Sequence, residues 1–201
     1  TFTSSSTSAS DVVGMFNFGS SNWTASNNTV GGITAANSST GASNIYGIRV
    51  NTSSAATFTC QNNTIGGSIA NSIQSTSTAT GTTVQGILNS NPAGTITGNL
   101  IRNLTAAGGT GTSTAASVIG ICSAVSSANH TVRQNTIHTL SNTSASAATT
   151  IIGIQYTAST GTNLVARNFI HSFNAASTSA ILNGINVSGG TTTYANNMIR
   201  L

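Results

Sequence analysis

The side chains that could carry out acid–base, nucleophilic or metal chemistry are few in this sequence. They comprise one carboxylate, three imidazoles and two thiols: Asp11, His130, His138, His171, Cys60 and Cys122. Enzymes that hydrolyse glycosides use a pair of carboxylates, and calcium sites use several acidic oxygen ligands. A single carboxylate cannot supply either arrangement, and no Gly-x-Ser-x-Gly motif marks a nucleophilic serine. We therefore expect no catalytic residue, no bound metal or cofactor, and no enzymatic activity.

The two cysteines are expected to remain unpaired. Cys60 and Cys122 lie far apart in the sequence, outside the short spacings that bind metals. Cys60 occupies a position of the repeat where other copies carry Ile96 or Val132, so it is expected to be a small core residue. Cys122 falls on a different strand of a non-adjacent coil, too distant for a disulfide.

The charge of the chain is positive but sparse. Five arginines and no lysine stand against one aspartate, which gives a formal net charge of +4. Nucleic-acid-binding proteins concentrate many more basic residues on one surface, so no nucleic acid is expected as a partner. No apolar run approaches the length of a membrane span, so no membrane insertion is expected.

A repeat organises the chain. The phrase Asn-x-Ile/Val recurs six times, beginning at Asn28, Asn63, Asn99, Asn135, Asn168 and Asn197. It alternates with a second phrase, apolar-x-Gly-Ile/Met, whose glycines are Gly14, Gly47, Gly86, Gly120, Gly153 and Gly184. Regular self-similarity at such a period is the signature of a stacked repeat protein. We expect residues 1–201 to form a single array.

Apolar residues within each repeat fall at spacings of two and three, which is typical of short strands and not of helices. One row follows each asparagine by two positions: Val30, Ile65, Ile101, Ile137, Ile170 and Ile199. A second row is assigned to Ile33, Ile69, Leu104, Leu140 and Phe173. Three strands per repeat in identical phase predict a coil whose strands lie parallel to those of the next coil.

The recurring asparagines have two structural interpretations. Stacked coil on coil, their carboxamides can hydrogen-bond along the axis and form a ladder that fixes the register. Alternatively, asparagine simply tolerates the left-handed backbone conformation of a tight turn. The recurring glycines are expected to mark a bend or a close approach of the backbone.

The alternation of Asn-x-Ile with Gly-Ile resembles the repeat of right-handed parallel β-helix (pectin-lyase-like) proteins, over essentially the whole chain. The resemblance implies an all-β fold, a β-solenoid of about six coils of three short strands with Ser/Thr/Ala-rich loops. Enzymes of that family rely on carboxylates that this chain lacks. It therefore resembles the non-enzymatic, secreted or surface members.

One lateral surface is a candidate contact site. The positions three residues after the asparagines are expected to point outward, and in the C-terminal half they form a cationic or titratable stripe: Arg102, His138, His171 and Arg200. Such a stripe suits an anionic glycan, a phosphate or a neighbouring chain. The alternative is a solvated face whose like charges are screened by water.

The two ends of the array are the candidate assembly sites. Phe2 precedes Val12 at nearly the spacing that separates Phe173 from Leu182, so Phe2 is assigned to the second apolar row. The segments Thr1–Phe2 and Ile199–Arg200–Leu201 carry no polar cap of the kind that closes most repeat arrays. Two explanations fit: subunits stack head to tail, or the array is a section of a longer solenoid.

The first hypothesis is therefore a structural protein that forms extracellular fibres, secreted or at a cell surface, with a second copy of itself as partner. The alternative is a glycan-binding adhesin or tailspike-like stalk that uses a lateral face. The third is ice binding, which needs a regular threonine array. The threonines are assigned to the variable tracts instead of one fixed position of the repeat, which makes ice binding the weakest of the three.

Overall fold

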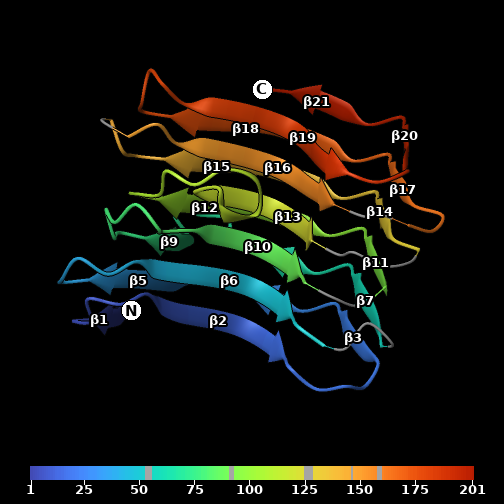
Figure 1. Cartoon of the computed structure of the whole chain (residues 1–201), viewed down its shortest axis with the longest axis horizontal. Coiled ribbons are helices and arrows are strands. Elements are labelled where there is room, and N and C mark those ends of the chain that lie inside the picture. Colours follow the sequence, from blue (N-terminus) through green and yellow to red (C-terminus); the bar gives the residue numbers. More distant parts are fainter. Residues whose placement is uncertain (53–55, 91–92, 125–128, 146, 158–159) are drawn as a thin grey trace.

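The computed structural model describes residues 1–52, 56–90, 93–124, 129–145, 147–157 and 160–201. Within these ranges the chain is a parallel β-solenoid of about six coils, and its single helical element is the 3-10 turn η1 (Ser113–Ala115). The coils stack from the N-terminal to the C-terminal end of the chain (Figure 1). The predicted fold class is thus confirmed.

Three parallel sheets form the walls of the solenoid, each receiving strands from successive coils. Sheet A contains β1 (Phe2–Ser4), β5 (Ile33–Asn37), β9 (Ile73–Ser75), β12 (Leu100–Ala106), β15 (Thr136–Asn142), β18 (Phe169–Ala175) and β21 (Met198–Arg200), with β8 (Thr64–Ile65) beside β12 and β4 (Thr29–Val30) beside β8. Sheet B contains β2 (Ser10–Asn17), β6 (Ser43–Val50), β10 (Val84–Asn89), β13 (Val118–Ala124), β16 (Thr150–Thr157) and β19 (Ile181–Gly189). Sheet C contains β3 (Trp23–Ser26), β7 (Thr57–Gln61), β11 (Ala93–Thr97), β14 (Thr131–Arg133), β17 (Leu164–Ala166) and β20 (Thr193–Ala195).

The core is a set of apolar columns that run along the axis. The row two residues after each asparagine is in register throughout, and Ile65, Ile101, Ile137 and Ile170 are fully buried. The rows on either side of the sheet B glycines are likewise in register between β2 and β19. Because parallel strands repeat the same inward positions, each coil adds one side chain to every column.

Two row assignments made from the sequence are wrong. Ile69 is 73% exposed, and the residue that lies between Ile33 and Leu104 in the second row is Ile73. Extra residues in the turn before β9 shift the chain, so spacing from the asparagine misleads in this coil. Phe2 pairs with Ala35, two positions beyond Ile33, and so lies outside the second row.

The sheet B glycines mark the predicted close approach. A Cβ atom on Gly120 would lie 2.6 Å from the carbonyl oxygen of Gly153 and 2.6 Å from Cγ2 of Ile137. The same two kinds of contact recur at Gly47, Gly86 and Gly153. The isoleucine of sheet A therefore packs directly on the sheet B backbone, which only glycine permits.

The polar tract before β13 covers the outside of sheet B. The turn η1 packs on β13, and Ala116 is completely buried. Ala116 packs in one cluster with buried side chains that point outward from sheet B, among them Ile119, Cys122 and Ile152. This small second core was not predicted from the sequence. Cys60 is buried in the main core, and both cysteines are free, as expected.

The first and last coils leave apolar side chains partly uncovered. Phe2 is 40% exposed, Met198 63%, Ile199 47% and Leu201 51%. No helix in the described ranges is long and apolar enough to cross a membrane.

Candidate functional site

The corner between sheets C and A is built around the recurring asparagines, called here the asparagine ladder. It comprises Asn28, Asn63, Asn99, Asn135, Asn168 and Asn197. From Asn63 onward, the Oδ1 atom of each member accepts hydrogen bonds from the backbone N–H and the Nδ2 of the member one coil before it, at 2.9–3.1 Å. The predicted axial hydrogen bonding is therefore present.

Each interior carboxamide also donates a hydrogen bond from Nδ2 to a backbone carbonyl oxygen. The Nδ2 of Asn135 also donates to the carbonyl oxygen of Ile96 at 3.0 Å, and Asn99 donates in the same way to Cys60 at 3.0 Å. Asn63, Asn99, Asn135 and Asn168 are each about 1% exposed, so these bonds lie in the interior. The left-handed backbone conformation of the turn is adopted by the residue before each ladder asparagine and not by the ladder asparagine itself. The ladder asparagines therefore serve the axial hydrogen bonding and not the turn.

The ladder is open and directional at its two ends. Among the described residues, no group donates to Oδ1 of Asn28, and the backbone N–H of Asn197 has no acceptor. One end of the solenoid therefore presents an unused amide oxygen and the other presents unused N–H groups.

The lateral stripe predicted from the sequence is in register. Its members occupy neighbouring coils on the outer face of sheet A: Arg102, His138, His171 and Arg200. The rings of His138 and His171 stack at a centroid distance of 4.9 Å with planes 6° apart. Phe169 stacks on His171 at 4.3 Å. In each histidine, Nδ1 shares a hydrogen bond with the hydroxyl of the following residue at 2.8 Å.

The environment of His138 disfavours its charged form. Partial burial lowers the pKa of His138 below its ordinary value of 6.5, and the nearby His171 and Arg102 lower it further. The stripe is therefore less positive near neutral pH than its residue types suggest.

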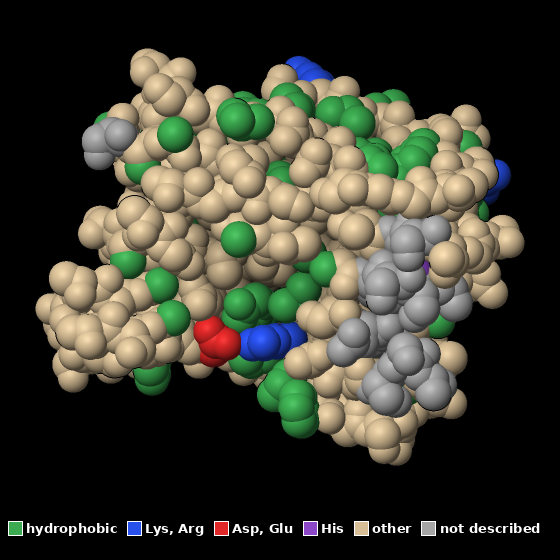
Figure 2. All heavy atoms as spheres, in the orientation of Figure 1, with side chains coloured by type: hydrophobic (Ala, Val, Ile, Leu, Met, Phe, Trp, Pro, Cys, Tyr) green, Lys and Arg blue, Asp and Glu red, His purple; other side chains and the backbone are tan. Residues whose placement is uncertain are grey.

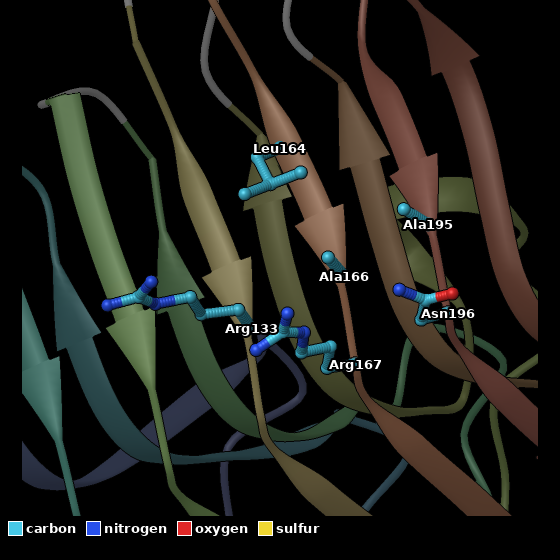
Figure 3. Close-up of a pocket in the computed structure, with 6 residues that line it drawn as sticks. All are labelled: Arg133, Leu164, Ala166, Arg167, Ala195 and Asn196. Atoms are coloured by element: carbon cyan, nitrogen blue, oxygen red, sulfur yellow. The ribbon is translucent and has the colours of Figure 1, made fainter.

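A shallow groove on the outer face of sheet C was missed by the sequence analysis (Figure 3). It has a volume of about 250 Å³ and is lined by Arg133, Leu164, Ala166, Arg167, Ala195 and Asn196. Figure 3 shows the side chains of Arg133 and Arg167 extending in the same direction from neighbouring coils. The signal was available, because Arg133 stands two residues before Asn135 and Arg167 stands one residue before Asn168. They stand at different offsets, however, and only the register brings them together: Arg133 lies opposite Ala166, the residue before Arg167.

The charges of the chain are distributed unevenly. Asp11 accepts a hydrogen bond from Arg49 at 2.8 Å and another from Asn44 at 3.0 Å, and this ion pair lies on β2 and β6 of sheet B. The acidic side chain is seen against an arginine in Figure 2. The other four arginines flank the asparagine ladder: Arg102, Arg133, Arg167 and Arg200. The net charge of +4 is thus carried along one corner of the solenoid.

A regular row of threonines runs along the outer face of sheet C, contrary to the sequence analysis. Its members stand four residues before the ladder asparagines: Thr24, Thr59, Thr95, Thr131 and Thr193, with Leu164 in the remaining coil. The abundance of threonine in the variable tracts concealed this fixed position.

No known family, curated protein or solved structure matches the chain. Within the described residues, no cluster of three or more His, Cys, Asp or Glu side chains could hold a metal ion. The features of the molecule that bear on function are the asparagine ladder, the end coils, the lateral stripe, the groove and the threonine row.

Proposed function

We propose that this chain is a structural, non-enzymatic β-solenoid unit that assembles head to tail with further copies of itself into extracellular fibres. In this proposal it is a secreted or cell-surface relative of the pectin-lyase-like β-helix proteins. The single observation that carries the proposal is the directional, open asparagine ladder. An end that offers an amide oxygen is the complement of an end that offers N–H groups.

Continuation of the ladder specifies the contact between two copies. Asn197 of one copy would donate its backbone N–H and Nδ2 to Oδ1 of Asn28 in the next copy, as Asn168 donates to Asn197 within the chain. The Nδ2 of that Asn28 would then donate a hydrogen bond to the carbonyl oxygen of Tyr194 in the first copy, as Nδ2 of Asn63 donates to the carbonyl oxygen of Ala25 within the chain. Each new interface would thereby repeat a geometry already present between coils.

The apolar columns support the same register. Ile199 would stack on Val30 of the next copy, and Met198 on Thr29. Ile199 and Met198 are partly exposed on the last coil, and burying them is favourable by roughly 25 cal/mol per Å² of apolar surface. The low charge of the chain also favours association of two copies. Asp11 is paired with Arg49, and the two stacking faces carry little like-charge repulsion.

The proposal is tested by comparing the 201-residue chain with the variants Ile199→Arg and Ile69→Arg. Both positions are exposed, so both variants should keep the wild-type circular dichroism spectrum. Electron microscopy of the wild-type chain should show filaments with an axial repeat near six strand spacings, about 29 Å. Ile199→Arg should sediment as a monomer, because a charged side chain then faces the apolar end of the partner, whereas Ile69→Arg should assemble normally. A wild-type chain that stays monomeric at every concentration, or oligomers that persist in Ile199→Arg, would contradict the proposal.

The threonine row supports ice binding as a second candidate function. Four hydroxyls, from Thr24 to Thr131, recur once per coil on one face at about 4.8 Å per step, and Leu164 interrupts the row before Thr193. A regular array of this kind can order water along the axis. Thermal hysteresis of the wild-type chain that disappears in Thr59→Arg/Thr95→Arg would support it, and an unchanged freezing point of the wild-type solution would rule it out.

A further inference from the structure

The outer face of sheet A carries two stacked histidine rings at its surface. His138 on β15 and His171 on β18 lie in register, and both side chains are half-buried. Their rings are parallel, with centroids 4.9 Å apart. Among the described residues, neither Nε2 atom has a hydrogen-bond partner, whereas both Nδ1 atoms have one. Two imidazole nitrogens on neighbouring coils are therefore available to a ligand.

The hydroxyl bonded to each ring is held there by the backbone. Thr139 and Ser172 have φ angles of 55° and 60°, in the left-handed region. Successive side chains of a regular strand point to opposite faces, but each of these hydroxyls bonds to the ring of the histidine before it. When Nδ1 carries the proton and donates it to the hydroxyl oxygen, Nε2 keeps its lone pair free. Hydrogen bonds of this kind fix the tautomer of metal-binding histidines.

The preceding coil shows that the turn itself does not require this hydroxyl. Asn103 stands there with a φ angle of 55°, and its Nδ2 donates to the carbonyl oxygen of Gly67. Asparagine tolerates the left-handed conformation better than threonine, whose side chain is branched at Cβ. A hydroxyl thus accompanies the imidazole in both histidine coils, although the turn alone would favour asparagine.

The available atoms select the class of ion. Imidazole nitrogen binds Zn²⁺, Cu²⁺ and Ni²⁺, whereas Ca²⁺ and Mg²⁺ require oxygen ligands. A metal–nitrogen bond of about 2.0–2.1 Å places two nitrogens bound to one ion about 3 Å apart. The rings stand further apart than that, but rotation of these surface side chains about χ1 and χ2 can bring their Nε2 atoms together while the strands stay in register. Water would fill the remaining coordination positions.

The charges around the pair keep the rings neutral but oppose a bare cation. Burial lowers the pKa of His138, and His171 and Arg102 lower it further, so an ion does not have to displace a proton near neutral pH. Arg102 precedes the pair and Arg200 follows it in the same row. The Nε of Arg102 donates at 3.5 Å to the carbonyl oxygen of Gly66 in the coil before, away from His138. Removing the charge of Arg102 should therefore strengthen the binding of a cation.

We infer that His138 and His171 form a bidentate site for a divalent transition-metal ion, with Thr139 and Ser172 as positioning residues for the two rings. The site lies on the lateral surface and needs no second copy, so it goes beyond the assembly proposal. It departs from the expectation, drawn from the few side chains capable of such chemistry, that no metal binds.

The test measures binding of Zn²⁺ and Cu²⁺ to the 201-residue chain by equilibrium dialysis near neutral pH, which counts bound ions per chain whether or not the chain assembles. We expect saturable binding of both ions and none of Ca²⁺ or Mg²⁺. His138→Gln and His171→Gln should each bind at least about tenfold more weakly, because each leaves a single ligand. Arg102→Gln is the matched control and should bind at least as tightly as wild type.

The positioning role of the hydroxyls is tested separately. Thr139→Val/Ser172→Ala should bind about tenfold more weakly, because the tautomer is no longer fixed. Thr139→Ser/Ser172→Thr keeps both hydroxyls and should bind as wild type does. Equal loss of affinity in these two double variants would overturn the positioning role.

Electron paramagnetic resonance of the Cu²⁺ complex identifies the ligands. We expect splitting from two nitrogens in the wild-type chain and from one nitrogen in either single histidine variant. The histidine variants change surface side chains, so their circular dichroism spectra should match that of wild type. Wild-type affinity in either variant, or a one-nitrogen spectrum of the wild-type chain, would overturn the inference. Equal binding of Ca²⁺, or no saturable binding of Zn²⁺ and Cu²⁺, would also overturn it.

Discussion

At each interior rung of the ladder, one asparagine side chain makes at least four hydrogen bonds, at least two through Oδ1 and at least two through Nδ2. For Asn135 the partners are Asn99, Ile96 and Asn168. A buried amide that is completely satisfied stabilises one register, whereas a truncated one leaves several partners unsatisfied.

Asn135→Ala should therefore lower the free energy of unfolding by about 3–5 kcal/mol, since it leaves buried donors and acceptors on two neighbouring coils unpaired. Asn28→Ala, at the open end of the ladder, removes fewer bonds and should have a clearly smaller effect. Urea unfolding followed by circular dichroism measures both. Equal destabilisation of the two variants would show that the axial bonds do not set the stability.

His138 should make stability dependent on pH. Because its pKa in the folded chain lies below the ordinary value of 6.5, the unfolded chain takes up the proton first as the pH falls. The contribution of the neutral ring is therefore present above pH 6.5 and decreases as the pH is lowered through that value. We expect a lower melting temperature at acidic pH and a weaker pH dependence in His138→Gln. A melting temperature that rises on acidification would contradict this.

Residue types alone predicted the ladder and the stripe but missed the groove. Asparagine and isoleucine recur at one offset, so their stacking could be inferred from spacing. Arg133 and Arg167 differ in offset by one position, and they line the same groove only because Arg133 pairs with Ala166, the last residue of β17, which Arg167 follows. Their proximity depends on side-chain direction at a turn, which spacing does not encode.

At the scale of the strand, glycine permits the contact between sheets A and B. Gly120→Ala should lower stability by about 1–3 kcal/mol, because the added methyl would overlap the Gly153 carbonyl and Ile137. Gly189→Ala is the matched control, since its Cβ would have no atom within 4 Å. Thermal unfolding of the two variants measures the difference, and a Gly120→Ala chain as stable as Gly189→Ala would refute the close approach.

The assignment of the buried apolar columns is tested by placing an acidic residue at a buried position and, as a control, at an exposed one. Ile121→Asp places an unpaired carboxylate in a fully buried row and should cost more than about 4 kcal/mol, enough to disrupt the stack. Ile69→Asp, at the exposed turn, should change stability little. If both variants unfold at the wild-type urea concentration, the column assignment is wrong.

The strands were predictable where the coil length is regular and not where turns vary. The rows around the sheet B glycines follow from the repeat, because each coil crosses that sheet in the same way. Before β9 the turn is longer, and the pattern selected Ile69 although Ile73 completes the column. The covering of Ile119 and Cys122 by the polar tract could not be foreseen either, because serine- and alanine-rich segments carry no periodic signal.

For the whole molecule, stability is expected to vary along the axis. Apart from the hydrogen bond between Ser113 and Ser188, which reaches one coil further, the contacts of each coil are with its neighbours, so an interior coil has two stabilising interfaces and an end coil has one. In the monomeric Ile199→Arg variant, amide exchange should be slowest in β10, β13 and β16 and faster in β2 and β19. Hydrogen exchange with mass spectrometry measures this profile, and uniform exchange across all coils would show that the array unfolds as a single unit.

The satisfied carboxamides also have an electrical consequence. All of them point the same way, so their small dipoles add along the rod and do not cancel. One tip is thereby slightly electronegative and the opposite tip electropositive, and each additional winding lengthens the separation. Two such rods lying flank to flank would attract when they run in opposite senses and repel when they run in the same sense.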